Sequence, residues 1–279
     1  MIELLKSLLF GIVQGITEWL PVSSTGHMIL LEELVKLNVS EAFWEMFLVV
    51  IQFGSILAVV VLYFSKLNPF SGKKSAEEKR DTWKLWLKVL IAVIPSAVFG
   101  LLLDDWIDAH FFNYITVAVA LIVYGVAFIL IERRRTGKHE VRTELEDIDY
   151  RTALMIGVFQ ILALIPGTSR SGSTILGAML LGLTRTSAAE FSFFMAIPTM
   201  LGASGLKILK FMMDGGSFAG QEIAILLVGV VTAFVVSLFA IKALMRYVRR
   251  HSFSAFGVYR IVLGIVVLGY FIVKTFVLK

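Results

Sequence analysis

Residues 11–30, GIVQGITEWLPVSSTGHMIL, decide the fold, because this stretch begins like a membrane helix and then becomes polar. Ionisable groups such as Glu18 and His27 are costly in hydrocarbon, and in a membrane protein they indicate a functional site. The breaks at Pro21 and Gly26 predict two half-helices that meet at a loop. Loops at membrane depth are tolerated only where they are buried in protein or line a cavity. We therefore expect a re-entrant helical hairpin that holds a polar site.

The composition of the whole chain is typical of an integral membrane protein. Its 279 residues are 58% apolar and 17% charged, with a mean hydropathy of +0.85. The apolar runs are long and continuous and lack the alternation of strands, so they predict an all-α fold. The net charge of +5 is expected to report loop topology, and we predict no nucleic-acid partner. Without cysteine, the chain has no disulfide and no thiolate metal site.

Six further apolar runs predict transmembrane helices, and a second polar hairpin is expected at residues 152–183 around PGTSRSGST. The six predicted spans are residues 47–64, 89–103, 114–131, 191–208, 223–241 and 256–277. Basic loops at residues 66–88 and 133–142 predict a cytoplasmic side, and an acidic loop at residues 104–108 predicts the outer side. Both termini are then expected outside.

The two hairpins are related by a weak internal repeat. A shift of 146 residues aligns Gly11 with Gly157, Gln14 with Gln160, Ser23 with Ser169 and Gly26 with Gly172. Each half holds one hairpin and an odd number of spans, so the second half would be inserted upside down, as in inverted-topology repeats. The prediction is a single polytopic domain, residues 1–279, with halves of approximately 1–140 and 141–279.

In that geometry the polar tips of the two hairpins converge on one cavity. Each tip precedes an apolar half-helix, so backbone N–H groups and the positive end of a helix dipole face the cavity. Arg170 adds a guanidinium, whose planar fork suits phosphate oxygens. The groups expected to bind the substrate anion with it are the side-chain amide of Gln14 and the hydroxyls of Ser23, Ser24, Thr25, Thr168, Ser169 and Ser171. The pattern predicts an anion site.

Ser24, His27 and Glu18 are the residues expected to carry chemistry. Ser24 and His27 lie three apart, so they share a helix face as a nucleophile and base. Gln14 and Glu18 lie four apart and can point at the same cavity. Glu18 can orient His27, act as a general base, or bind Mg²⁺ or Ca²⁺ together with Gln14, in which case a phosphate would have to complete the site. Whether Ser24 or His27 is the nucleophile stays open.

These motifs resemble a known family. Residues 14–18 followed by LPVSSTGH, then PGTSRSG and EFSFFMAIP from Glu190, are similar to undecaprenyl pyrophosphate phosphatases of the bacitracin-resistance type across nearly the full chain. The resemblance implies phosphate binding by Ser169 and Arg170. It also implies a hydroxyl cluster with a histidine in residues 23–27. The acidic motif of the family accepts Glu or Gln first; here Gln14 leaves Glu18 as the sole acid, which weakens a two-carboxylate metal site.

The resemblance implies an enzyme of the bacterial inner membrane that removes the terminal phosphate from undecaprenyl diphosphate. The monophosphate would re-enter peptidoglycan synthesis, and the activity would give resistance to bacitracin. We expect the site to face the periplasm or outer side, with the polyprenyl diphosphate and membrane lipid as partners and a homodimer as one expected assembly. The alternative is an inverted-repeat transporter or flippase for a phosphate-bearing lipid or anion, which needs anion donors but no nucleophile and base.

Overall fold

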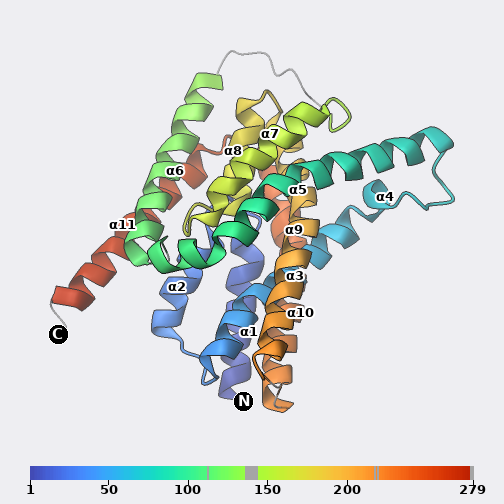
Figure 1. Cartoon of the computed structure of the whole chain (residues 1–279). Coiled ribbons are helices and arrows are strands. Elements are labelled where there is room, and N and C mark those ends of the chain that lie inside the picture. The colour runs from blue at the N-terminus through green and yellow to red at the C-terminus, as the bar shows by residue number, and fades with distance from the viewer. Residues whose placement is uncertain (112, 136–143, 217, 219, 277–279) are drawn as a thin grey trace.

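The computed structural model describes all residues except 112, 136–143, 217, 219 and 277–279, and its elements are helices throughout (Figure 1). The first half contains α1 (Ile2–Thr17), α2 (Ser24–Leu34), α3 (Glu41–Leu62), α4 (Phe64–Leu67), α5 (Ala76–Phe111) and α6 (Tyr114–Arg135). The second half contains α7 (Tyr150–Ile161), the 3₁₀ turn η1 (Leu162–Leu164), α8 (Arg170–Leu180), α9 (Arg185–Met213), α10 (Gly220–Val248) and α11 (Ser254–Phe276). The all-α prediction is confirmed.

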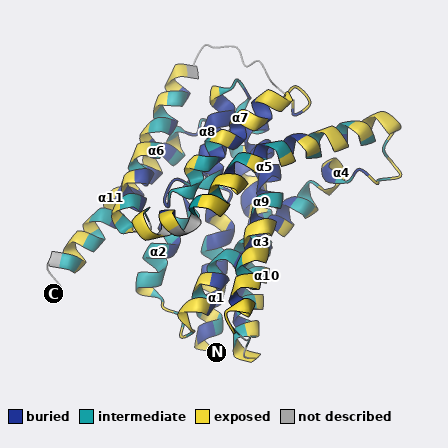
Figure 2. Cartoon of the chain, viewed as in Figure 1, coloured by how far each residue is buried: buried dark blue, intermediate teal, exposed yellow. Residues whose placement is uncertain are grey.

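Six of the described helices are long and apolar enough to cross a membrane, as the sequence predicted. They are α3, α5 over Ala76–Leu103, α6, α9, α10 and α11. Many of their exposed residues are large and apolar, and the exposed positions are the yellow bands on the long helices in Figure 2. Apolar surface of this extent needs a lipid environment. The chain is therefore a multi-pass membrane protein.

Helix α5 corrects two sequence predictions. This one helix includes residues 76–88, which were expected to form part of the basic loop. It also includes residues 104–108, which were expected to form the acidic loop. It begins with a capping box, in which the Ser75 N–H donates to Glu78 at 2.7 Å and the Glu78 N–H donates to the Ser75 hydroxyl at 3.2 Å. The Lys and Glu residues that follow are good helix formers, so the helix starts well before the apolar run. Lys138 and Arg142 of the second basic loop lie outside the described residues.

The long helices pack in pairs that join the two halves of the chain. Helix α1 packs on α10, α7 on α5, α3 on α9 and α6 on α11. Where α6 crosses α11, a Cβ atom on Gly125 would lie 2.6 Å from the Gly257 carbonyl oxygen, and one on Gly257 would lie 2.6 Å from that of Gly125. Small residues allow such close backbone approach between membrane helices. The halves are therefore interleaved.

Shorter helices of the chain form two helix pairs of similar form, which pack against the membrane-spanning helices. We call α1 with α2 the first helix pair and α7, η1 and α8 the second helix pair. In each, the two helices contact one another across a short polar turn. Helix α8 is buried along nearly its whole length, whereas only Gly26 and Met28 are buried in α2. Helix α8 is thus enclosed by protein, whereas α2 is partly open to its surroundings.

Candidate active site

Each helix pair turns at a serine in an unusual backbone conformation. Ser23 and Ser169 have φ angles of 72° and 73°, and they are the non-glycine residues with positive φ in the described part of the chain. Their hydroxyl oxygens cap the following helices by accepting the Gly26 N–H at 3.3 Å and the Gly172 N–H at 3.2 Å. Such strain costs about 1–3 kcal/mol per residue and concentrates at functional sites. Matching strain at matching positions indicates that both turns belong to the site.

Glu18 connects the two helix pairs. It directly follows α1, and it is only 5% exposed. Its Oε1 atom accepts a hydrogen bond from Arg170 Nη2 at 3.1 Å. Its Oε2 atom accepts from Gln14 Nε2 at 2.9 Å and from Ser24 Oγ at 3.3 Å. The Ser171 hydroxyl donates to the Glu18 carbonyl oxygen at 3.1 Å. These contacts bring together five of the residues that the sequence singled out.

Arg170 is the first residue of α8 and is held on three sides. Besides Glu18, its guanidinium donates through Nη1 to the Ser192 carbonyl at 2.8 Å, and it lies 5.9 Å from the ring centroid of Trp19. Its buried Nε atom has no hydrogen-bond partner among the described residues. A cation at a helix N-terminus opposes the helix dipole and therefore requires an anion beside it. Glu18 supplies that anion here.

His27 makes different contacts from those expected. Its Nδ1 atom lies 2.7 Å from the Ser23 carbonyl oxygen, so this nitrogen carries the proton. Its Nε2 atom lies 2.7 Å from the Tyr259 hydroxyl, which donates to it, and the two rings stack with centroids 5.6 Å apart. Within the described residues, neither Ser24 nor Glu18 is hydrogen-bonded to His27. Ser24 and His27 share a helix face, but Tyr259 and the Ser23 carbonyl occupy the imidazole, and the partner of Ser24 is Glu18.

Arg260 of α11 is the residue that sequence reasoning did not place in the site. It is fully buried, and it donates to the carbonyl oxygens of Pro21 at 3.2 Å, Gly167 at 2.9 Å and Thr168 at 2.8 Å. Its guanidinium also lies 5.6 Å from the Tyr124 ring centroid. Arg260 therefore ties the two polar turns to each other. The available signal was an arginine within an apolar span, which must find partners inside the protein.

The remaining predicted residues line the same turns. Ser169 lies with its hydroxyl 3.2 Å from that of Ser171, and Thr168 is fully buried and contributes its carbonyl to Arg260. Thr25, the second residue of α2, is half-buried, and within the described residues its hydroxyl has no hydrogen-bond partner. Their binding of substrate phosphate stays a prediction.

A metal site made by protein groups alone does not fit this arrangement. The described residues contain no group of three or more His, Asp or Glu side chains placed to hold a metal ion. Both oxygens of Glu18 already accept hydrogen bonds, and one donor is the Arg170 guanidinium, whose positive charge disfavours a cation beside it. The Gln14 amide turns its N–H₂ group toward Glu18. Mg²⁺ or Ca²⁺ at Glu18 and Gln14 stays a prediction.

The fold and the site together define a class of protein: a multi-pass helical membrane protein with a buried carboxylate, hydroxyl and guanidinium cluster, of the kind suited to a phosphate group. Residues 7–266 match the family described as Bacitracin resistance protein BacA. The match covers most of the chain. This protein therefore belongs to that family.

Curated relatives are similar to this chain over nearly their whole length. An undecaprenyl-diphosphatase of Streptococcus thermophilus is 58% identical over 273 residues, which are 98% of this chain and 95% of the relative. An undecaprenyl-diphosphatase of Enterococcus faecalis is 57% identical over 270 residues, 97% of this chain and 98% of the relative. One of Streptococcus pyogenes is 56% identical over 269 residues, 96% of each.

Proposed function

We propose that this protein is an undecaprenyl-diphosphatase, which hydrolyses the terminal phosphate of undecaprenyl diphosphate to give undecaprenyl phosphate and phosphate. Its close relatives bear that name. The observation that carries the proposal is the buried chain of contacts from Ser24 through Glu18 to Arg170. In this proposal, Ser24 is the hydroxyl nucleophile, Glu18 is the carboxylate base and Arg170 is the phosphate-binding guanidinium of one site. A carrier of anions would need only the last of these.

The proposed fold is one polytopic domain of two inverted halves, approximately 1–140 and 141–279, with the two helix pairs as re-entrant hairpins. Support comes from the matching caps at Ser23 and Ser169 and from the exchanged packing of α1 on α10 and α7 on α5. The reciprocal contact of Gly125 with Gly257 is expected near a pseudo-two-fold axis. We place the basic ends of the helices on the cytoplasmic side of the bacterial inner membrane, and the site opening toward the outer side.

In the proposed reaction, the terminal phosphate of the substrate binds Arg170 and the amide groups at the start of α2 and α8. Phosphate oxygens then replace Glu18 on the guanidinium, so the freed carboxylate can accept a proton. Ser24 Oγ attacks the terminal phosphorus in line, and its proton passes to Glu18 Oε2, which it already contacts at 3.3 Å. The bond from phosphorus to the bridging oxygen breaks, undecaprenyl phosphate leaves, and water then hydrolyses the phosphoserine.

Fixed donors stabilise the charge that develops in phosphoryl transfer, so Arg170 and the two helix N-termini are expected to contribute a large part of the rate. His27 is engaged by Tyr259 and the Ser23 carbonyl, so we assign it to positioning Ser23 and α2 rather than to attack. The prenyl chain is expected to lie along the lipid-facing helices. A homodimer stays a prediction.

The proposal is tested by measuring release of inorganic phosphate from undecaprenyl diphosphate by the purified protein in detergent or lipid. We expect turnover in the native chain, and a fall by orders of magnitude in Arg170→Ala. Near-normal turnover in Arg170→Ala would contradict the proposed site. Movement of the intact lipid across vesicles without any phosphate release would favour the transporter alternative.

A further inference from the structure

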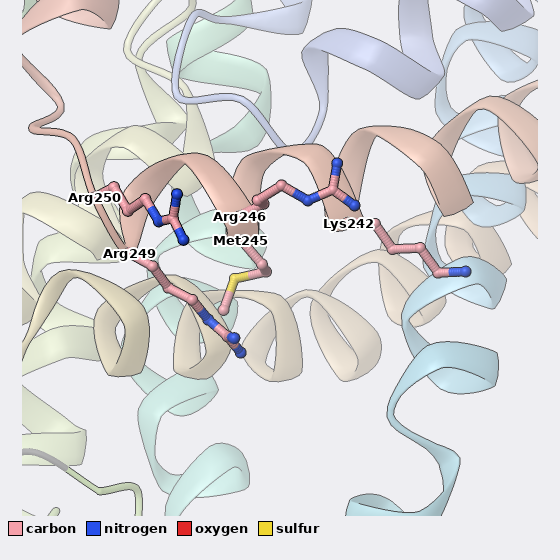
Figure 3. Close-up of a pocket in the computed structure, with 5 residues that line it drawn as sticks. All are labelled: Lys242, Met245, Arg246, Arg249 and Arg250. Atoms are coloured by element: carbon pink, nitrogen blue, oxygen red, sulfur yellow. The ribbon is translucent and has the colours of Figure 1, made fainter.

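A hollow of about 510 Å³ lies at the C-terminal end of α10, away from the polar turns of the helix pairs. Its lining is four cations around one apolar side chain. Figure 3 shows these residues along the last turns of α10 and in the turn directly after it: Lys242, Met245, Arg246, Arg249 and Arg250. We call these five residues the α10 basic groove. Among the described residues, no acidic side chain lines it.

The cations of the α10 basic groove are not neutralised within the described protein. None of its four basic side chains has a hydrogen-bond or ion-pair partner among the described residues; they are Lys242, Arg246, Arg249 and Arg250. Glu190 of α9, a helix that contacts α10, is bound to Lys66 at 2.7 Å. Four like charges around one hollow repel one another, so an anion within it would be stabilised.

A second hollow, of about 140 Å³ at α5, provides the contrast. It is also lined by two basic side chains, but acidic residues lie among them. Lys84 is ion-paired with Asp81 at 2.9 Å, and Lys88 donates to the Glu146 carbonyl at 3.0 Å. The basic side chains of that hollow therefore already have partners within the protein. The α10 basic groove is therefore not simply an example of how basic residues are arranged throughout this chain.

The surface next to the α10 basic groove is apolar and faces lipid. Leu227, Val231, Val235 and Phe239 are exposed at four-residue intervals on α10, which is a candidate membrane span over Gly220–Val248. At about 100° per residue, these positions lie on the same helix face as the groove cations. An apolar stripe that leads into a cationic hollow matches an amphiphile, with acyl chains along the stripe and an anionic group at its end. Free phosphate would use only the hollow.

We propose that the α10 basic groove binds the phosphate headgroup of an anionic membrane phospholipid, with the acyl chains of that lipid against the exposed α10 stripe. Basic pockets at the cytoplasmic ends of membrane helices bind such headgroups. The site is separate from the Ser24, Glu18 and Arg170 cluster. It therefore does not depend on the proposed reaction.

The test is native mass spectrometry of the purified full chain in neutral detergent with equal amounts of phosphatidylglycerol and phosphatidylcholine. The native chain should retain phosphatidylglycerol preferentially. Arg246→Gln with Arg250→Gln should weaken that retention by about 25-fold, since each cation near an anionic lipid contributes about fivefold. The matched control removes two paired lysines of the α5 hollow, Lys84→Gln with Lys88→Gln, and should retain the lipid as the native chain does.

Thermal unfolding in neutral detergent should be the same for the native chain and the α10 variant, which separates lost binding from lost folding. Equal retention of both lipids by the native chain would overturn the proposal. So would unchanged retention in the α10 variant, or an equal loss in the α5 control. Displacement of the lipid by excess inorganic phosphate, with no preference for phosphatidylglycerol left, would identify a phosphate site and overturn the lipid assignment.

Discussion

The two helix pairs share one backbone frame but present different side chains on it. In both, a serine with positive φ caps the second helix and accepts the N–H of a glycine three residues later. The first residue of that helix is Ser24 in the first pair and Arg170 in the second, which are equivalent under the shift of 146 residues. One frame therefore offers a hydroxyl and the other a guanidinium at the same place beside a helix N-terminus.

The surroundings of the two helix pairs also differ. Helix α8 is enclosed by protein, so Arg170 is fixed by Ser192 and Trp19 and cannot follow a moving ligand. Helix α2 is only partly buried, and the acid Glu18 stands where the second pair has Leu164. In the proposed reaction, the two frames supply two helix N-termini for one anion. The first pair then carries the bond chemistry and the second pair carries the charge stabilisation.

Removing the hydroxyl of the first pair should have the largest effect. In Ser24→Ala, turnover should fall by about 10⁴-fold or more, because a nucleophile acts as a unit with its base. The KM should change little, since Arg170 still binds the phosphate. Phosphate release over a range of substrate concentrations measures both. Ser204→Ala, which removes a buried hydroxyl bonded to the Val49 carbonyl, is the control and should be near normal. A loss of less than tenfold in Ser24→Ala would assign the chemistry elsewhere.

Removing the guanidinium of the second pair should come next. Arg170→Ala should lower turnover by about 10³-fold, the scale of fixed donors and arginine fingers in phosphoryl transfer. It should also lower stability by about 3 kcal/mol, because Glu18 is left as a buried, unpaired charge. Glu18→Gln combined with Arg170→Ala should recover stability but not turnover. If turnover recovered together with stability, neither Arg170 nor Glu18 would take part in the reaction.

Loosening the two pairs from each other should have an intermediate effect. Arg260→Ala leaves the carbonyls of Pro21, Gly167 and Thr168 without their donor, and we expect about 3 kcal/mol lower stability. Misplacement of the turns should reduce kcat by about 10²-fold with little change in KM. Arg260→Lys should recover part of the kcat, because the charge remains while the fork is lost. Lower stability with an unchanged kcat would contradict the positioning role.

Releasing His27 should have the smallest effect. Tyr259→Phe keeps the stacked ring but removes the hydroxyl that donates to His27 Nε2. Loss of one hydrogen bond of about 1 kcal/mol should change kcat by less than about tenfold. Steady-state kinetics at one pH is sufficient to measure this. A fall as large as that of Ser24→Ala would instead make the His27 and Tyr259 pair part of the reaction.

The sequence predicted the spans well because continuous apolar runs leave little choice in a membrane. It also predicted that Glu18, Ser24 and Arg170 meet, since each is costly in hydrocarbon and they fall in related turns. It did not predict the ends of α5. Charged residues at 76–88 are compatible with either a loop or a helix, and the capping box at Ser75 decides between them.

The partners of His27 and Arg260 could not be derived from spacing. Helical spacing places His27 on the face of Ser24, but the direction of its ring is set by Tyr259, which lies 232 residues away in the chain. An arginine within an apolar span must find partners inside the protein, and this applies to Arg260. Its partners include the carbonyls of Pro21 and Gly167, which are equivalent positions under the shift of 146 residues. Whether Arg260 reaches both carbonyls depends on how α11 packs between the two turns. Such contacts belong to tertiary structure.

The most direct test of the central claim is to locate the phosphate during turnover. The protein would be mixed with undecaprenyl diphosphate labelled in its terminal phosphate, quenched in acid within the first turnover, and digested for mass spectrometry. The division of labour between the pairs predicts an acid-stable phosphoserine at Ser24 that is absent from Arg170→Ala on the same timescale. An acid-labile label at His27, or label on a residue of the second helix pair, would contradict it.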